Sequence, residues 1–493
     1  MSETKGSYRQ IFKATSIFGG VQVFNILVTI IRSKFIAILL NPAGMGIVGL
    51  LTSTTGLITG LTNFGLGTSA VKNVAAANAS GDVEKLGKTV ATFRRLVWIT
   101  GLLGLLVTLI TAQWLSKITF GNDDYTMAFI FISVTLLFTQ LSAGQMVILR
   151  GMRKIQYMAK ASLFGALIGL VTSIPLYYFY EEKGIVPAII VTSLTALLLT
   201  WHFSNRISIP KFKPDKEMIF TEGKEMLKMG FLISLSNLIT LGTSFLVRIF
   251  INKHGNVGDV GLYVAGFSLI GNYVGIVLTS MSTDYYPRLS AVFYDNKKCK
   301  QEINQQAEIA ILLLAPIIII FFVFSKWAII ILYSHKFIPI ATMVLWAALG
   351  IFFKAASWSI AFIFLAKSEG KIYFWNELAG NIYLLCLNCV GYYYMGLTGL
   401  GISFLIAYFL YFIQVLFVSR KLFQFSFGRE FIRIFMIQIF LAIISFSVQF
   451  SSKITSYSVG ILMIIFSLSY SYKILNKKLN ISQILMKRIN IKL

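Results

Sequence analysis

Charged side chains are scarce in this sequence. Only 13% of its 493 residues are Asp, Glu, Lys or Arg, whereas an average globular domain carries about 25%. A soluble surface cannot be built from so few charges, and 56% of the residues are hydrophobic, with a mean hydropathy of +0.76. This composition excludes a soluble enzyme and a disordered chain, and it indicates a polytopic membrane protein.

Cysteine and histidine are also rare, with three of each. Three cysteines exclude a disulfide scaffold, and the pair Cys386 and Cys389 has no second ligand pair nearby to complete a metal site. The histidines are too scattered for a catalytic constellation, and the sequence lacks the G-x-x-x-x-G-K-[ST] loop of an ATPase. We therefore expect no enzyme activity beyond translocation, no metal and no bound cofactor.

Acidic residues are the scarcer charged class, with 19 Asp and Glu against 44 Lys and Arg. A helix needs roughly 20 apolar residues to cross the membrane. If the N-terminus is cytoplasmic, the inner loops hold 34 of the 44 cations and the outer loops hold 8. This asymmetry places both termini in the cytoplasm, and it accounts for the net charge of +25 without a nucleic-acid partner. The fourteen candidate spans lie at about 14–40, 45–70, 96–115, 126–149, 161–180, 185–203, 230–252, 261–286, 306–325, 340–366, 373–394, 397–418, 432–450 and 456–472.

A weak internal repeat relates the first six spans to the next six. Arg32 lies 14 residues before Gly46, and Arg248 lies 13 residues before Gly261. Two further pairs of segments keep the same order and nearly the same offset, namely 149–157 with 365–373 and 177–184 with 392–399. Ordered matches of this kind indicate a duplication.

The repeat predicts an all-α membrane fold of about fourteen transmembrane helices. Two parallel six-helix bundles are related by a pseudo-two-fold axis along the membrane normal, and two helices follow them. The expected domains are an N-terminal lobe (1–203), a cytoplasmic linker with a surface helix (204–229), a C-terminal lobe (230–420), and two additional helices with a basic cytoplasmic tail (421–493). Substrates of such proteins bind between the bundles.

Five motifs carry a resemblance to a known family. They are NPAGMG at 41–46, VRIFINK at 247–253, VGLYVAG at 260–266, YPRLS at 286–290 and GLTGLG at 396–401. The resemblance covers about residues 8–420 and is to the Wzx-type flippases of O-antigen and enterobacterial common antigen. Those flippases form the polysaccharide-transporter branch of the multidrug/oligosaccharidyl-lipid/polysaccharide (MOP) exporter superfamily. Many O-antigen flippases have twelve spans, and this chain adds two.

The resemblance implies a flippase of the bacterial inner membrane. It would move an undecaprenyl-pyrophosphate-linked oligosaccharide, such as an O-antigen repeat unit of lipopolysaccharide, from the cytoplasmic to the periplasmic leaflet by alternating access. A polysaccharide polymerase and glycosyltransferases are the implied protein partners, and the energy source is left open between H⁺ and Na⁺ coupling and the substrate's own gradient.

Four cations are candidates for binding the pyrophosphate. Lys354 lies near the middle of its span, where a charge costs roughly 2.5–3.5 kcal/mol to insert; a buried structural ion pair is the alternative. Arg248 and Arg32 occupy repeat-related positions near the outer end of their helices, where they either line a cationic cavity or snorkel to the headgroups. Lys34 ranks lower, because it faces a different side of the helix from Arg32.

Two carboxylates and four glycines complete the candidate site. Asp284 lies four residues before Arg288, so a plain ion pair competes with a role in proton coupling. Glu377 either neutralises a nearby lysine or couples transport to an ion. The repeat-related pairs Gly56/Gly60 and Gly271/Gly275 predict close helix approach and bending at the lobe interface, with packing alone as the alternative.

Two rival functions are compatible with the sequence. A cation-coupled drug exporter on the same superfamily fold would need a carboxylate cluster deep in one lobe, and the first six spans contain no Asp or Glu. A polysaccharide polymerase or ligase would need a large periplasmic loop for its catalytic residues, and no outer loop exceeds about 15 residues.

Overall fold

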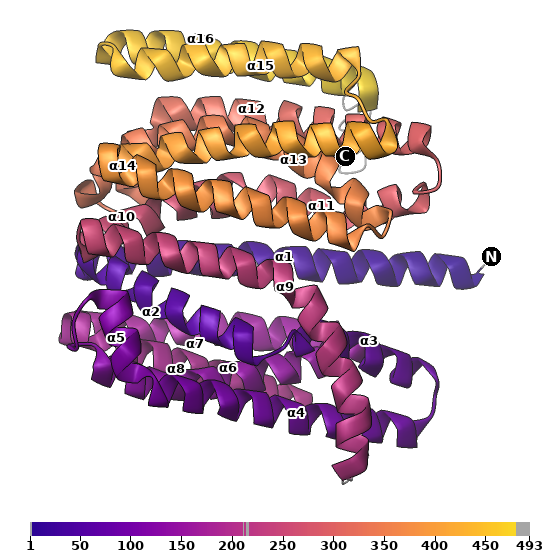
Figure 1. Ribbon diagram of the computed structural model, residues 1–493. Helices are drawn as coiled ribbons and strands as arrows, with labels where there is room; N and C mark the ends of the chain where they lie inside the picture. Colours follow the sequence, from indigo (N-terminus) through magenta and orange to yellow (C-terminus); the bar gives the residue numbers. More distant parts are fainter. Residues whose placement is uncertain (1, 211, 213–215, 480–493) are drawn as a thin grey trace, which may run out of the picture. The chain divides into compact units, whose positions relative to one another are not determined.

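The computed structural model describes residues 2–210, 212 and 216–479, and these ranges contain helices and no strand. The predicted all-α fold class is confirmed. The α-helices are shown in Figure 1, and three short 3₁₀ segments lie between them in the described chain: Glu181–Gly184, His335–Ile340 and Val448–Phe450. Their bounds are α1 (Ser2–Leu39), α2 (Asn41–Thr62), α3 (Leu66–Ala79), α4 (Val83–Ile110), α5 (Ala112–Phe120), α6 (Thr126–Gly151), α7 (Ile155–Tyr180), α8 (Ile185–Ser204), α9 (Lys216–His254), α10 (Val257–Ser268), α11 (Ile276–Ala291), α12 (Asn296–Leu332), α13 (Ala341–Ala366), α14 (Gly370–Phe423), α15 (Arg429–Ser447) and α16 (Lys453–Leu479).

Eleven helical segments of the described chain are long and apolar enough to cross a membrane. Two of them are too long for one crossing, since roughly 20 residues suffice. The segment Ile155–Ser204 has 50 residues and contains α7 and α8, and Gly370–Phe423 has 54 residues and is broken at Gly396, where φ is 57°. The protein is therefore a multi-pass membrane protein, and the count of fourteen crossings stays a prediction.

The chain forms two compact units, residues 1–261 and 262–493. In unit 1, α4 packs on α6, α6 on α8, and α1 on α7, while α9 packs on α2 and α3. The stretch expected as a separate surface helix is the first part of α9, which continues without a break into the next apolar segment. Figure 1 shows that α9 changes direction along its length. The basic tail at 480–493 lies outside the described residues.

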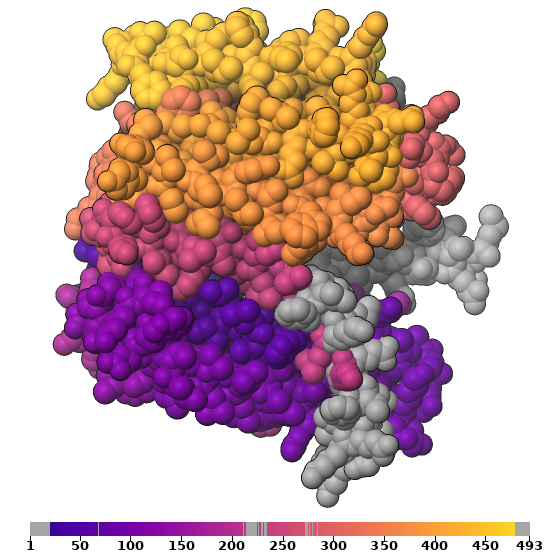
Figure 2. Space-filling model, viewed as in Figure 1, coloured from indigo at the N-terminus to yellow at the C-terminus, as the bar shows by residue number. Residues whose placement is uncertain are grey.

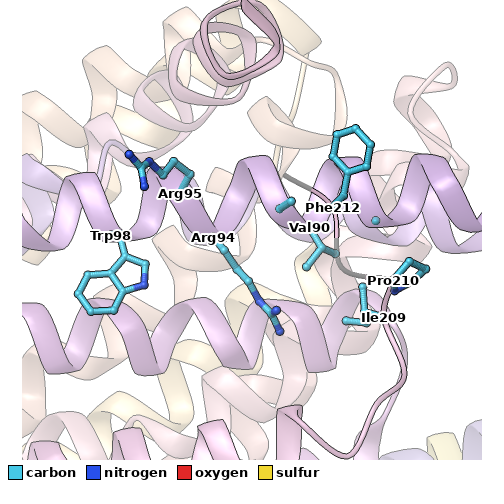
Figure 3. A pocket seen from close by; sticks show the side chains of 9 residues that line it. Val90, Arg94, Arg95, Trp98, Ile209, Pro210 and Phe212 are labelled. Carbon is cyan, nitrogen blue, oxygen red and sulfur yellow. The ribbon is translucent and has the colours of Figure 1, made fainter. Parts of the chain in front are cut away.

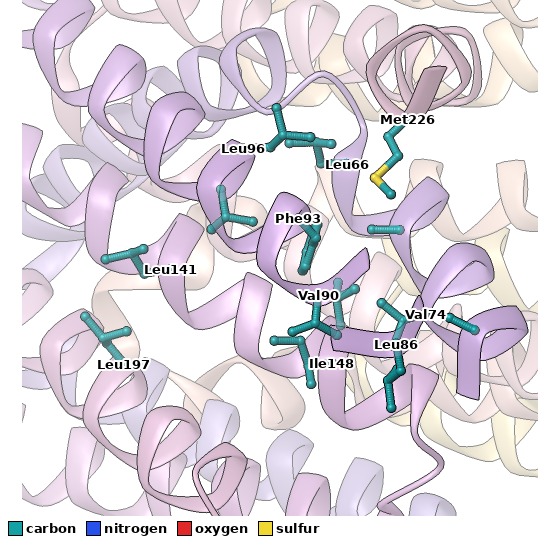
Figure 4. Packing of buried hydrophobic residues seen from close by; sticks show 14 residues of the cluster. Leu66, Val74, Leu86, Val90, Phe93, Leu96, Leu141, Ile148, Leu197 and Met226 are labelled. Atoms are coloured by element: carbon teal, nitrogen blue, oxygen red, sulfur yellow. The ribbon is translucent and has the colours of Figure 1, made fainter. Parts of the chain in front are cut away.

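A hydrophobic core joins five helices of unit 1, with Leu197 as the member from α8. Phe93 of α4 is 1% exposed and is surrounded by apolar residues of α3, α4 and α6 together with Met226 of α9 (Figure 4). The turn before α4 is fixed by Asp82, whose carboxylate accepts a hydrogen bond from the Lys85 backbone N–H at 3.0 Å. Capping of this kind satisfies one of the N–H groups left over at a helix start, so this end of α4 is well positioned.

The last two helices are integral to unit 2. Both α15 and α16 pack on α12, and the space-filling view shows them as one continuous surface with their neighbours (Figure 2). Polar contacts tie them together: the Gln438 amide donates to the Ser471 hydroxyl at 2.8 Å and accepts from the Ser467 hydroxyl at 2.7 Å. Lys478 of α16 pairs with Glu308 of α12 and Glu430 of α15.

The backbone geometry repeats at the offset seen in the sequence. The turn before α7 has Arg153 at φ 55°, and the turn before α14 has Ser368, the repeat-related position, at φ 60°. Each turn also contains the same pair of backbone hydrogen bonds, for example Lys154 N–H to Leu149 C=O and Glu369 N–H to Phe364 C=O. The two halves therefore fold alike in detail at these turns.

Two repeat-related glycines make a reciprocal contact in unit 1. A Cβ on Gly46 would lie 1.9 Å from the Val257 carbonyl oxygen, and a Cβ on Gly261 would lie 1.8 Å from the Pro42 carbonyl oxygen. Both distances are far below contact, so only glycine fits at either position. One and the same sequence offset relates Gly46 to Gly261 and Pro42 to Val257. This crossing of α2 and α10 explains why two of the family-like motifs contain these glycines.

Candidate functional site

The central feature of unit 2 is a lysine in the middle of an apolar helix. Lys354 is the fourteenth of 26 residues in α13 and is half-buried. Its ammonium lies over the rings of Phe404 and Tyr408 of α14, at 5.8 and 5.2 Å from the ring centroids. Aromatic faces stabilise a cation by about 0.5–2 kcal/mol each, more where water is absent. The cation is thus held by ring faces at mid-span.

A carboxylate from the first part of α14, before the break at Gly396, lies near this lysine. Glu377 Oε1 accepts a hydrogen bond of 2.6 Å from the Tyr411 hydroxyl, and Glu377 interacts electrostatically with Lys354. Tyr411 is 9% exposed and belongs to the apolar core of unit 2 that also contains Tyr285 and Phe364. The apolar core therefore holds Tyr411 in place, and the Tyr411 hydroxyl in turn holds the Glu377 carboxylate.

Two glycines allow the aromatic residues to come this close. A Cβ on Gly380 would lie 2.8 Å from a Tyr411 ring atom, and a Cβ on Gly350 would lie 2.7 Å from a Phe404 ring atom. Both positions need glycine because a side chain would displace a ring. The close packing of α13 on α14 thereby sets the distance between the lysine and the carboxylate.

This cluster, hereafter the α13/α14 site, consists of Lys354, Glu377, Phe404, Tyr408 and Tyr411. It combines one ammonium, one carboxylate and several ring faces at membrane depth. An anionic ligand group that approached the ammonium would compete with the carboxylate, and a proton or cation on the carboxylate would strengthen the ammonium's attraction for an anion. The rings also suit sugar faces, against which aromatic side chains pack.

Asp284 lies in a separate polar cluster of unit 2. Its carboxylate pairs with Arg288 Nε at 2.8 Å, in the i,i+4 arrangement considered from the sequence. The same guanidinium also pairs with Glu302 at 2.9 Å and donates to Gln306 at 3.0 Å. Asp284 is exposed, and the contacts of Arg288 fasten α11 to α12.

The two repeat-related arginines have different surroundings in unit 1. Arg32 of α1 packs against α7, where a Cβ on Gly169 would lie 3.0 Å from its Nη2 atom, and it interacts electrostatically with Tyr177. Arg248 of α9 donates from Nη1 to the Gly49 carbonyl oxygen of α2 at 2.8 Å. Both guanidinium groups thus join helices of the same unit. Lys34 is half-buried two positions after Arg32.

The four predicted glycines also differ among themselves. A Cβ on Gly60 would lie 2.9 Å from a Leu238 methyl group, so Gly60 permits the packing of α2 on α9. No described atom lies within 4 Å of a Cβ on Gly56 or Gly271. Gly275 follows a short π-helical segment, Leu269–Val274, which is a common form of local helix distortion. Their role at a lobe interface remains a prediction.

Several residues of these clusters were not foreseen from the sequence. The aromatic residues Phe404, Tyr408 and Tyr411 are typical of any membrane helix, and nothing marks them individually. Their spacing at i, i+4 and i+7 places them on one helix face, which was an available signal. Glu308, which is 5% exposed, also went unrecognised as an ion-pair partner.

The fold defines the class of this protein as a helical, multi-pass membrane protein. It matches the structure of the lipid II flippase MurJ in an inward closed conformation with a TM-score of 0.71, at 13% identity, over 94% of this chain and 99% of that one. An inward-facing multidrug resistance MATE family transporter of the MOP superfamily matches with a TM-score of 0.67, at 16% identity, over 82% of this chain and 94% of that one. At these identities the likeness establishes the fold.

The sequence comparisons identify the family. Residues 35–342 match the family of polysaccharide biosynthesis proteins, and the chain belongs to it. The lipid III flippases of Escherichia coli (strain K12) and Shigella flexneri are each 20% identical over 353 residues, covering 70% of this chain and 83% of theirs. The resemblance to flippases of the MOP superfamily is thereby confirmed in family and fold.

Proposed function

We propose that this protein is a flippase that moves a lipid-linked glycan across the bacterial inner membrane, from the cytoplasmic to the periplasmic leaflet. The observation that carries the proposal is the α13/α14 site, a lysine at mid-span among aromatic rings, in a chain of the polysaccharide biosynthesis family. The names of the lipid III and lipid II flippases among its relatives and fold neighbours support the same substrate class.

In this proposal the substrate is an undecaprenyl-pyrophosphate-linked oligosaccharide, such as an O-antigen repeat unit. Its pyrophosphate would cost many kcal/mol to bury without a cation, so Lys354 is its first proposed partner. Arg32, Arg248 and Lys34 are proposed as further cations on its path. An arginine has five N–H donors, so Arg248 could donate to the Gly49 carbonyl and also bind the pyrophosphate.

The same site offers a coupling group. Glu377 is proposed to exchange its electrostatic interaction with Lys354 for a proton or Na⁺ when the anion arrives, while Asp284 is a weaker candidate because Arg288 already pairs with it. Both termini are proposed to be cytoplasmic from the distribution of basic residues. A polymerase and glycosyltransferases would act on either side of the transport step.

A drug exporter is the second candidate, because a MATE transporter shares the fold. The first six predicted spans contain no carboxylate with which to bind a coupling cation. A lysine at mid-span favours an anionic substrate, and the flippase is the better supported function.

The test is the pair of substitutions Lys354→Ala and Lys354→Arg, with Lys371→Ala as the matched control. Lys371 is exposed, at the start of α14. With each variant, surface glycan is measured in cells that depend on this gene, and membrane levels are measured in parallel. We expect K354A to reduce glycan display about tenfold or more, K354R to retain part of it, and K371A to resemble the unmodified protein. Normal display with K354A at equal protein level would refute the role of Lys354.

A further inference from the structure

A basic groove lies along α4 in unit 1. Its volume is about 280 Å³, and its lining includes Arg94, Arg95, Trp98 and the backbone segment around Pro210 and Phe212. Figure 3 shows Arg94 and Trp98 leaving the same side of α4, while Arg95 points to another side. The described lining residues include two arginines and no acid.

The segment at 209–212 closes one end of this groove. Gly87 allows the segment to approach, because a Cβ there would lie 3.2 Å from the Pro210 carbonyl oxygen. On the other side of the segment, the Lys88 ammonium lies 5.3 Å from the centroid of the Phe212 ring. Pro210 and Phe212 thereby lie against α4, and with Ile209 they form a wall of the groove.

The other end of the groove extends toward the apolar part of α4. Trp98 is 50% exposed, one turn beyond Arg94, and it lies near the start of the predicted third span. Tryptophan at such a position is typical of the level of lipid headgroups. The groove thus runs from a cationic, headgroup-level part to an apolar part that faces lipid chains.

Arg94 brings hydrogen-bond donors to the groove. Its Nε atom is buried out of reach of a ligand and has no hydrogen-bond partner among the described residues, so the terminal Nη groups are the donors that a ligand in the groove could reach. Burying a donor without a partner costs free energy, and an arginine fork matches the geometry of a phosphate. Pockets for drug-sized ligands have roughly 300–1,000 Å³, so a groove of about 280 Å³ suits a headgroup and is too small for a glycan.

We infer that this groove binds the phosphate headgroup of an anionic lipid of the cytoplasmic leaflet, with the lipid chain passing Trp98. Arg94 contacts the phosphate, and the bound headgroup also touches Ile209 and Pro210, which line the groove. The inference stands on unit 1 alone and does not depend on the proposed flippase function. The same chemistry is offered by a phospholipid and by a polyprenyl phosphate, and the phospholipid is the abundant source.

The test measures lipid binding to the detergent-purified protein by native mass spectrometry. Phosphatidylglycerol, phosphatidylcholine and soluble glycerol phosphate are compared. The variants are Arg94→Gln, Arg95→Gln and Ala91→Phe, which fills the groove and keeps both charges. Arg150→Gln is the matched control, because Arg150 is an exposed arginine at the end of α6 that does not line the groove.

We expect phosphatidylglycerol to bind at least tenfold more tightly than phosphatidylcholine or glycerol phosphate. R94Q should weaken the binding of phosphatidylglycerol about tenfold. A91F should abolish that binding, and R150Q should leave it unchanged. If R94Q does not fold, A91F carries the test, and R95Q serves as a second control because its side chain points to another side of α4 (Figure 3). Equal binding of glycerol phosphate, equal losses in R94Q and R150Q, or full binding in A91F would overturn the inference. Undecaprenyl phosphate is added as a competitor: displacement of phosphatidylglycerol assigns the groove to both lipids, and no displacement assigns it to the phospholipid.

Discussion

Replacing Lys478 by methionine should destabilise the attachment of α16. The Lys478 ammonium pairs with Glu430 at 2.8 Å and with Glu308, whose side chain is 7% exposed. Removing one partner of a fully buried ion pair costs about 3–5 kcal/mol, because the other charge stays buried. Lys478 is 32% exposed, so solvent screens part of this interaction. We therefore expect a loss of about 1–3 kcal/mol.

The double variant Lys478→Met/Glu308→Gln separates the buried charge from other effects. A neutral glutamine at 308 no longer needs a cation, so the second substitution should restore part of the stability lost in the first. Thermal unfolding in detergent and limited proteolysis near α16 measure both. Glu430→Gln is the matched control, because its side chain is 72% exposed and it should cost under about 0.5 kcal/mol. Equal stability of Lys478→Met and the unmodified protein would refute the reasoning.

Three other predictions concern single positions. Gly46→Ala should abolish accumulation of folded protein, because the new Cβ would lie 1.9 Å from a carbonyl oxygen. Gly56→Ala is the control and should accumulate normally, because no described atom lies within 4 Å of a Cβ at that position. Immunoblots of membranes compare the two variants. Asp295→Ala should lower the melting temperature at pH 7, and this effect should shrink as the pH is lowered into and below the usual carboxyl range. Backbone N–H groups in the first turn of α12 hold the pKa of the Asp295 carboxyl below its usual range. The carboxylate therefore stabilises the fold at pH values above its unfolded pKa, and this stabilisation is lost as the pH falls through the folded pKa. A cysteine introduced by Ala79→Cys should react with an impermeant maleimide only in opened cells, because position 79 is expected on the cytoplasmic side. A cysteine introduced by Lys183→Cys should also react in intact spheroplasts, and the reverse pattern would overturn the predicted orientation of the chain.

The sequence was sufficient for the class of fold and for the repeat. Long apolar runs dictate membrane helices, since a buried backbone must satisfy its own hydrogen bonds. The constant offset between the halves was readable because glycine positions such as Gly46 and Gly261 admit no other residue. Helix continuity was less predictable: polar residues before position 230 suggested a separate helix, but α9 is unbroken.

The partners of individual charged residues were harder to foresee. Lys354 lies just past the middle of α13 and Glu377 lies in the first turns of α14, so their approach could have been inferred from an antiparallel pair of helices. The bond from Arg248 to the Gly49 carbonyl could not, because a backbone acceptor leaves no mark in the sequence. Cys299 illustrates the same point: it lies in the polar first turn of α12, yet the residue is 0% exposed.

The reciprocal contact of Gly46 and Gly261 bears on how this fold arose. Each half of the chain contributes both a glycine without a side chain and the carbonyl that fills the vacant space. A single ancestral half would thus have carried both complementary parts, and two such chains inserted with the same polarity could have met through two identical contacts. Gene fusion would then have joined a pre-existing parallel dimer. The two glycines would be the surviving record of a symmetric interface between separate molecules.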